Sequence, residues 1–252
     1  MRCLSLLLLP IVLIIILISP VMAEETVARE SVDGEEGAEE DWDEFVDPDP
    51  WRGMNKKIHN FNDFVDVKLV RPVAVGYQKV TPQFFENGIS NVFNNLDDVG
   101  DAVNNVLQGK IGEGLSDVAR VLVNSTVGIL GWFDPATRME LTDHEEDWGQ
   151  TFAVWGVPAG PYFVIPGLGP STVRNAISRF LDGAVNPIRY LYPVRHRNMV
   201  YALRGIDTRA GLLSVDGVIF GDRYVFYRDA YLQRREYLEK DGEVDDPFAD
   251  DF

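Results

Sequence analysis

Apolar residues recur at steps of three and four along much of the chain, which is the spacing of one face of an α-helix. The clearest example lies between Pro82 and Lys110, and similar spacing marks residues 199–213 and 222–238. Alternation of apolar and polar residues, the pattern typical of strands, does not persist over several positions. The sequence therefore predicts a mainly α fold in one domain. The apolar face of the first segment consists of Phe85, Ile89, Val92, Phe93, Leu96, Val99, Val103 and Val106.

The segment from Ile111 to Phe133 begins as an amphipathic helix and then becomes apolar on nearly every side. A helix of that kind is either fully buried or surrounded by lipid. Asp134 and Pro135 are expected to end this helix, and a polar connector from Glu140 to Trp148 follows it.

Two helices are predicted in the C-terminal part of the chain besides the one over 199–213. Ser171 is a candidate N-cap for a helix from Thr172 to Leu181, which ends near Asp182 and Gly183. The last helix, 222–238, combines a stripe of tyrosines with several arginines. Tyrosine and arginine together suit a membrane–water interface, and they suit the surface of an ordinary helix bundle equally well.

The side of the 82–110 helix opposite its apolar face is rich in asparagine rather than in lysine and glutamate. Asparagine is a mediocre helix former in water, and a neutral polar face suits a wet, uncharged surface. A plain solvated face is the alternative interpretation. The asparagines concerned are Asn87, Asn91, Asn94, Asn95, Asn104 and Asn105.

The uncharged stretch from Thr151 to Val173 contains four prolines and four glycines and no charged residue. It is apolar enough to enter a membrane, but so many prolines and glycines exclude an ordinary spanning helix. Its backbone must therefore be covered by protein or line a cavity. One interpretation is a buried loop in a soluble core, and the other is a segment that contacts lipid.

The N-terminal residues 1–23 have the pattern of a secretory signal peptide, with Arg2 ahead of a long apolar run and a predicted cut before Glu24. The apolar run approaches the length of a spanning helix, so an uncleaved anchor is the alternative. Cys3, the chain's one cysteine, precedes the apolar run, whereas a lipid-attachment cysteine would follow it. The mature chain is therefore expected to carry neither an acyl group nor a disulfide.

The negative charge of the chain is concentrated at its two ends. Residues 24–50 carry a formal charge of −12 and residues 239–252 carry −6, and the signal contributes +1. Out of the total of −17, this leaves residues 51–238 with no net charge. We expect a disordered acidic linker over 24–48, a helical domain over 49–240 and an acidic tail over 241–252. A neutral body gives no long-range attraction for nucleic acid.

The residues that would support an enzymatic reaction are not arranged in any recognisable motif. His59, His144 and His196 are scattered, without partners at the spacing of metal ligands. Ser116 follows Gly114 by two residues, but no second glycine completes a nucleophile elbow. The sequence therefore predicts a protein that is not an enzyme and that has no cofactor or metal.

A set of short blocks is spread over residues 49–240: Asp49-Pro50-Trp51-Arg52-Gly53-Met54-Asn55, His59-Asn60-Phe61-Asn62, Val70-Arg71-Pro72-Val73-Ala74, Asn87-Gly88-Ile89-Ser90-Asn91, Leu107-Gln108-Gly109-Lys110, Arg120 with Val123-Asn124-Ser125-Thr126-Val127-Gly128, Gly156, Gly160-Pro161-Tyr162, Ile165-Pro166, Gly169-Pro170-Ser171-Thr172-Val173-Arg174 and Asp207-Thr208-Arg209-Ala210. Each block is weak alone, but the ordered set is specific. In this order they resemble the VacJ/MlaA family of outer-membrane lipid-asymmetry proteins.

The resemblance implies a ring of helices lodged in the inner leaflet of the outer membrane, on its periplasmic face. An amphipathic passage would admit a phospholipid mislocalised to the outer leaflet. A periplasmic lipid shuttle of the MlaC type would receive it, and trimeric porins would hold the ring in place. No cofactor, bond cleavage or nucleic acid is implied. The sequence departs from the family in lacking a lipobox cysteine.

The passage is expected to combine uncharged polar groups, apolar walls and a few basic residues. Arg71, Arg120 and Arg174 lie in matching blocks and could bind a phosphate, or else pair with a nearby aspartate or close a helix end. The full set of candidates is Asn60, Phe61, Asn62, Arg71, Asn91, Asn95, Arg120, Gly160, Pro161, Tyr162, Phe163, Ile165, Pro166 and Arg174.

Two other functions stay open at this point. The protein could be a scaffold that bridges porin and periplasmic partners without moving lipid, or an enzyme that cleaves lipid. Lipid movement without a chemical product separates transport from the enzyme. Loss of movement with partner binding intact separates transport from the scaffold.

Overall fold

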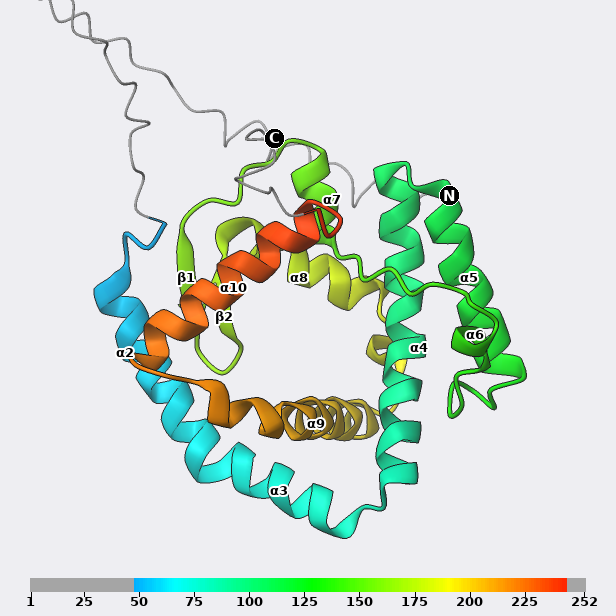
Figure 1. The fold of residues 1–252 in the computed structure, drawn as a ribbon, viewed down its shortest axis with the longest axis horizontal. Helices are drawn as coiled ribbons and strands as arrows, with labels where there is room; N and C mark the ends of the chain where they lie inside the picture. The colour runs from blue at the N-terminus through cyan, green and yellow to red at the C-terminus, as the bar shows by residue number, and fades with distance from the viewer. Residues whose placement is uncertain (1–47, 244–252) are drawn as a thin grey trace, which may run out of the picture. The chain divides into compact units, whose positions relative to one another are not determined.

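The computed structural model describes residues 48–243, and it confirms a mainly helical fold (Figure 1). The expected signal peptide, nearly all of the acidic linker, and the C-terminal tail from residue 244 lie outside the described residues. The first helical run consists of α2 (Arg52–Val65), the π-helical turn η1 (Asp66–Val70) and α3 (Arg71–Val80). The π-helical turn η1 comes just before Pro72, which cannot donate a backbone hydrogen bond.

The predicted 82–110 helix is confirmed as α4 (Gln83–Gln108), which packs against α5 (Ile111–Thr126). Gly109 ends α4 in the left-handed conformation, with φ +89°. Its N–H donates to the carbonyls of Asn105 and Val106. At Gly114 a side chain would lie 3.1 Å from the carbonyl oxygen of Ala102, so the two helices approach closely because this residue is glycine.

The prediction of one helix from Ile111 to Phe133 is wrong beyond Thr126. Residues 127–133 instead form a compact series of turns, here called the apolar turn, in which the N–H of Gly131 bonds to the carbonyl of Asn124. Three consecutive residues adopt positive φ, a conformation that ends a helix: Ile129, Leu130 and Gly131. The apolar turn is exposed rather than buried, with Val127, Ile129 and Leu130 at 71%, 64% and 76% exposure.

The uncharged stretch holds a β-hairpin that the sequence pattern did not reveal. After α6 (Pro135–Arg138), the connector and α7 (Trp148–Val154), strand β1 (Tyr162–Ile165) pairs antiparallel with β2 (Gly169–Thr172). Tyr162 and Val164 point into a core cluster with Tyr224, whereas Phe163 and Ile165 are half-buried. One side of the hairpin therefore packs in the core. The interpretation of the uncharged stretch as a buried loop had proposed this for the whole stretch.

The remaining helices follow the hairpin. They are α8 (Val173–Val185), the 3-10 turn η2 (Pro187–Tyr190), α9 (Val194–Gly211), the 3-10 turn η3 (Leu212–Val218) and α10 (Arg223–Glu239). The N-cap of α8 is Thr172, whose side chain accepts the N–H of Asn175, and not Ser171 as predicted. The helix also continues past the predicted end at Leu181.

The elements of this unit form a closed circuit of contacts. From α2 and α3 the circuit runs through α9 to α4, then through α7 and α8 to the hairpin, and β1 packs back on α2. Figure 1 shows these elements following one another around a closed path. Helix α10 contacts α2, β2 and α7, and so ties three parts of the circuit together.

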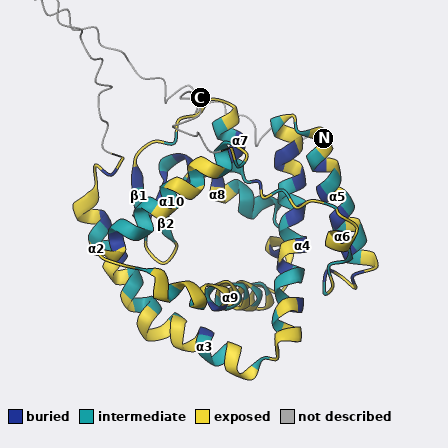
Figure 2. Ribbon diagram, viewed as in Figure 1, coloured by how far each residue is buried: buried dark blue, intermediate teal, exposed yellow. Residues whose placement is uncertain are grey.

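Few residues are fully buried and many are exposed (Figure 2), and most of the buried side chains are polar while many large apolar side chains are exposed. Within residues 48–243, eighteen buried residues are polar or charged and nine are apolar, while forty large apolar residues are exposed. This reverses the usual arrangement of a protein in water, in which buried polar groups are the exception. Within the same residues, none of the helices combines the length and apolarity needed to cross a bilayer.

Candidate functional site

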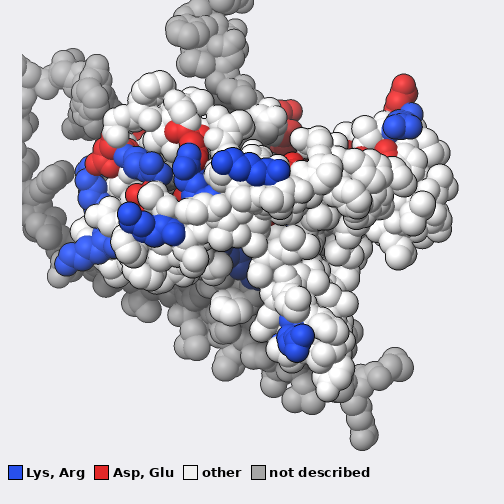
Figure 3. Space-filling model, turned by 90° about the horizontal axis from the view of Figure 1, so that it is seen from below, with Lys and Arg blue, Asp and Glu red and all other residues white. Residues whose placement is uncertain are grey.

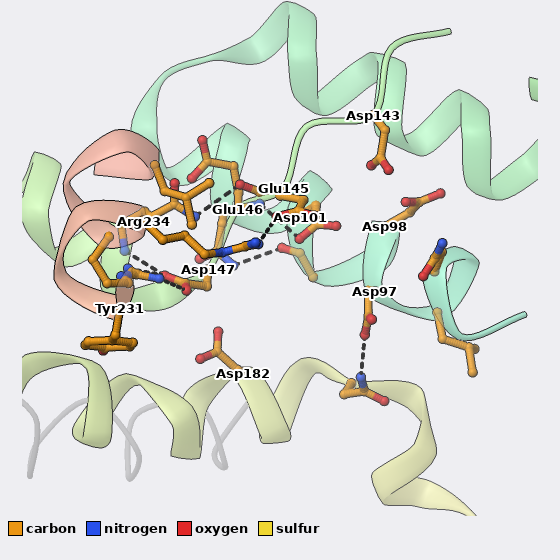
Figure 4. A pocket seen from close by; sticks show the side chains of 18 residues that line it. Asp97, Asp98, Asp101, Asp143, Glu145, Glu146, Asp147, Asp182, Tyr231 and Arg234 are labelled. Atoms are coloured by element: carbon orange, nitrogen blue, oxygen red, sulfur yellow. Dashed lines mark hydrogen bonds and ion pairs between the residues drawn. The ribbon is translucent and has the colours of Figure 1, made fainter. Parts of the chain in front are cut away.

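An acidic cavity of about 460 Å³ lies between α4, the connector, α8 and α10 (Figure 4). Figure 4 shows the aspartates of α4 facing the connector and Asp182 of α8 approaching from the opposite wall. Arginines of α10, Arg234 and Arg235, provide positive charge at this site. The acidic residues that line the cavity are Asp97, Asp98, Asp101, Asp143, Glu145, Glu146, Asp147 and Asp182.

Half of these acids have a close cationic partner. The ion pairs are Asp97 with Arg204 at 2.6 Å, Glu145 with Arg234 at 2.6 Å, Glu146 with Lys110 at 2.8 Å, and Asp147 with Arg235 at 2.5 Å.

Burial raises the pKa of three acids of the cavity that lack such a close partner. It raises the pKa of Asp101 to about 9, that of Asp98 to about 7 and that of Asp182 to about 6. The pKa of Asp98 rises despite Arg120, whose Nε lies 3.4 Å from the carboxylate. The cavity is therefore polar without being fully ionised at neutral pH.

The same unit has two apolar cavities besides this polar one. The hairpin cavity, of about 470 Å³, lies between α2, the hairpin, η3 and α10 and is lined by Leu168, Val215 and Phe226 among others. The α9 cavity, of about 360 Å³, lies between α4, η2 and α9. Leu96 of α4 lines both the acidic cavity and the α9 cavity. The interior of the circuit thus combines polar and apolar compartments.

The charged rim of the hairpin cavity joins α9 and η3 to η1 and α3. The guanidinium of Arg209 bonds to both oxygens of Asp66, at 2.8 and 3.0 Å, and to Asp216 at 2.9 Å. Asp216 also accepts from Arg71 at 2.9 Å. This network holds α9 and η3 against the first helical run by charge-assisted hydrogen bonds.

The structure brings the candidates on α2 and in the hairpin close together. Asn62 Nδ2 donates to the carbonyl of Ile165 at 3.0 Å, and its Oδ1 accepts the N–H of Gly167 at 2.7 Å. Asn62 also lines the hairpin cavity. Asn60 and Phe61 are exposed on the same helix.

The other hairpin candidates differ in burial. Tyr162 is buried in the core, and Phe163 packs edge-on against Trp51 with ring centroids 6.3 Å apart. Gly160, Pro161 and Pro166 are exposed.

The asparagines of α4 are placed differently from what the sequence indicated. Asn95 is buried and donates to Ser125 Oγ at 3.0 Å, while Asn91 donates to the carbonyl of Trp132 at 3.2 Å. Asn104 and Asn105 are also buried. The prediction of a wet face is therefore wrong for the buried asparagines, which join α4 to α5, α7 and the apolar turn. Asn91 still lines a cavity of about 490 Å³ beside that turn.

The three candidate arginines all have acidic partners, and they lie apart rather than in one cavity. Arg71 is half-exposed and bonds to Asp216. Arg120 is buried and donates to the carbonyl of Leu141 at 2.8 Å. Arg174 is buried between the carbonyl of Val157, at 2.9 Å, and the carboxylate of Glu239. These are the pairing roles that were the alternative to phosphate binding.

The sequence analysis missed the acidic cavity. Asp97, Asp98 and Asp101 follow the i, i+3 and i, i+4 spacing that places residues on one side of a helix, and this spacing was visible in the sequence. The connector acids that face them lie more than forty residues further along, so only the fold unites the two groups.

Comparison with known proteins identifies the family to which this chain belongs. The family model described as MlaA lipoprotein matches residues 47–238. The chain is 34% identical over 204 residues to the intermembrane phospholipid transport system lipoprotein MlaA of Escherichia coli (strain K12), which covers 78% of this chain and 80% of the relative. The chain belongs to the MlaA family.

Further MlaA proteins support the same conclusion. The Haemophilus influenzae MlaA is 26% identical over 207 residues, covering 78% of this chain and 81% of the relative. A solved structure described as the structural basis for maintenance of bacterial outer membrane lipid asymmetry is 32% identical, with a TM-score of 0.68. It covers 76% of this chain and 98% of that chain, so the circuit of helices matches almost all of that structure.

The MlaA relatives are lipoproteins by name, whereas this sequence is expected to lack a lipid-attachment cysteine. Residues 1–47 lie outside the described part of the chain. The non-lipidated mature N-terminus stays a prediction from the sequence.

Proposed function

We propose that this member of the MlaA family removes mislocalised phospholipid from the outer leaflet of the outer membrane and passes it through the interior of its helical circuit toward the periplasm. The observation that supports this most directly is the combination of one acidic cavity with two apolar ones, of which the α9 cavity shares Leu96 with the acidic cavity. A phospholipid needs apolar walls for its chains beside a polar path for its headgroup.

The exposed apolar surface supports a position within one leaflet. Large apolar side chains are exposed on α3, on the apolar turn and around α9, and in water each would cost hydrophobic free energy. In the hydrocarbon of a leaflet, exposure of these apolar side chains would carry no such free-energy cost. The polar interior can persist in such a setting because buried amides and carboxylates bond to one another.

The distribution of basic residues supports one orientation in the leaflet. Figure 3 shows lysines and arginines gathered in a band along one edge of the face that carries α3, above a broad surface with little charge. Residues 51–80 contain six basic residues and two acids, Asp63 and Asp66. Basic side chains reach to headgroup phosphates while their stems stay in the apolar region. The band would therefore lie at headgroup level.

The partners follow from the family. The relatives are components of an intermembrane phospholipid transport system by name, which supports a partner that accepts the lipid. We propose a periplasmic shuttle of the MlaC type as the acceptor and trimeric porins as the membrane support. The scaffold function makes the same contacts but predicts no lipid in the interior.

A charge in the hairpin cavity tests transport. We expect Val215→Asp to abolish phospholipid transfer from outer-membrane vesicles to the periplasmic acceptor, because it places a carboxylate where chains would pass. Ser214→Asp is the matched control: it adds the same charge to the same turn at an exposed residue outside the cavity lining. Transfer that persists in a folded Val215→Asp protein would contradict this route. Loss of transfer together with loss of acceptor binding would favour the scaffold.

A further inference from the structure

We propose that Asp98, Asp101 and Asp143 bind a divalent cation of the calcium type in the wall of the acidic cavity. This site is independent of lipid transport and can be tested on the purified protein. None of its three residues was a candidate from the sequence.

The geometry suits one ion. Each of the three carboxylates offers an oxygen, and these atoms all lie within 4.8 Å of one another. Calcium binds oxygen at about 2.3–2.6 Å, so two ligands of one ion lie at most about 5 Å apart. Asp98 and Asp101 are neighbours on one side of α4, and Figure 4 shows Asp143 of the connector on the side of the cavity that faces them.

The charge of this cluster is poorly compensated. Within residues 48–243 none of the ion pairs involves Asp101. Arg120 is the cation near the other two aspartates, with nitrogens 3.4 Å from Asp98 and 4.0 Å from Asp143. The same guanidinium lies 3.6 Å from Asp134 and donates its short hydrogen bond to a backbone carbonyl. One arginine thus serves three carboxylates.

A second observation concerns Asp98 itself. Its side chain is 2% exposed, and its Oδ2 accepts no hydrogen bond. A buried carboxylate oxygen without a hydrogen-bond donor costs free energy, and the 3.4 Å ion pair with Arg120 Nε, which is not a hydrogen bond, offsets only part of that cost. A cation held between Asp98, Asp101 and Asp143 would supply the missing interaction.

The ligand type favours a hard cation. The cluster consists of three carboxylates and includes neither histidine nor cysteine, so it matches the oxygen ligands of calcium or magnesium rather than those of zinc. Calcium tolerates the irregular geometry of a half-open cavity wall better than magnesium does, with water completing the shell. The ion would fix the irregular connector to α4 and thereby stiffen one wall of the acidic cavity.

Calcium-dependent stability tests the proposal on the full chain in detergent. After treatment with EDTA, we expect millimolar CaCl2 to raise the melting temperature by several degrees at constant ionic strength, since an ion that binds only the folded state stabilises it. Calorimetric titration should give one calcium ion per chain. The Asp101→Asn variant should fold and lose both the shift and the binding heat.

Asp182→Asn is the matched control, because Asp182 is a partly buried acid of the same cavity that lies outside the cluster. This variant should keep the calcium-dependent shift. The proposal is overturned if neither calcium nor magnesium shifts the melting temperature of the unmodified protein. It is overturned equally if Asp101→Asn and Asp182→Asn respond to calcium alike.

Discussion

Single buried amides perform the role that apolar side chains have in most protein cores. Asn55 is fully buried on α2, where its Nδ2 donates to Asp49 at 2.7 Å and to the carbonyl of Tyr162 at 3.3 Å. Its Oδ1 accepts the N–H of Val164 at 3.0 Å. One side chain thus pairs with a carbonyl and an N–H on one edge of β1, and its loss would leave these two backbone groups without this partner.

Replacing this amide should destabilise the fold. We expect Asn55→Ala to lower the free energy of unfolding by about 2–4 kcal/mol, because it removes three hydrogen bonds and leaves buried donors and acceptors unpaired. Asn60→Ala, at an exposed position of the same helix, should change it by less than about 0.5 kcal/mol. Denaturant unfolding in detergent measures both, and equal effects would argue against the role given to Asn55.

The acidic cavity predicts an unusual dependence of stability on pH. Burial, aided by the nearby charge of Asp147, raises the pKa of Asp182 to about 6, against the lowering effect of Arg235 and Arg179. Between pH 4 and 6 the folded state therefore keeps a proton that the unfolded chain releases. The contribution of Asp182 to stability is favourable in acid and is lost as pH rises through about 6.

Asp182→Asn should consequently stabilise the protein at pH 7.5 by about 1–2 kcal/mol and have little effect at pH 4. The amide oxygen can still accept the N–H of Trp148, which bonds to Asp182 at 3.0 Å. Unfolding measured at the two pH values provides the test. If Asp182→Asn were less stable than the unmodified protein at pH 7.5, ionisation of the Asp182 carboxylate would not destabilise the folded state, and this prediction would be wrong.

At the scale of elements, periodicity predicted the helices and failed where the chain turns. Helix α4 was found because its apolar residues keep the helical spacing over seven turns. The hairpin was missed because its strands have four residues each, too few for alternation, and because Asn55 and Asn62 of a distant helix hold it.

The prediction failed for a different reason at the apolar turn. Its apolar composition is typical of a buried helix, but its glycines allow the chain to reverse direction. A side chain at Gly128 would lie 2.4 Å from the carbonyl oxygen of Asn124, so the chain can fold back only with glycine there. Nor could sequence distinguish wet asparagines from buried ones on α4. That distinction depends on α5 and α7, whose positions the sequence does not specify.

A glycine substitution tests the geometry of this turn. Gly131 has φ +84°, and a Cβ there would lie 2.9 Å from Cβ of Asn95. We expect Gly131→Ala to lower the free energy of unfolding by about 1–3 kcal/mol. Gly112→Ala, inside α5 with open space around it, should be neutral or stabilising by up to about 1 kcal/mol. Thermal unfolding of the two variants measures both effects. A Gly112→Ala variant that is less stable than Gly131→Ala would contradict the described turn.

For the whole molecule, the reversed distribution of polar and apolar residues links the fold to the proposed function. An amphipathic interior accommodates a lipid, and an apolar exterior accommodates a leaflet. The ordered sequence blocks predicted the family, which the fold and the relatives confirm. Which residues line a lipid passage stays a prediction. Of the fourteen candidate passage residues, Asn62 and Asn91 are among the lining residues of the four cavities described above.

Photo-crosslinking in intact outer membranes tests the central claim most directly. A crosslinking amino acid is placed at Phe226 inside the hairpin cavity, at Leu130 on the exposed apolar turn, and at Glu236 on the exposed, charged side of α10. Lipid transport through the interior predicts phospholipid adducts with both acyl chains intact at Phe226 and Leu130, and few or none at Glu236. Adducts at Leu130 without any at Phe226 would mean a protein that sits in the leaflet with no lipid inside, and would contradict the account.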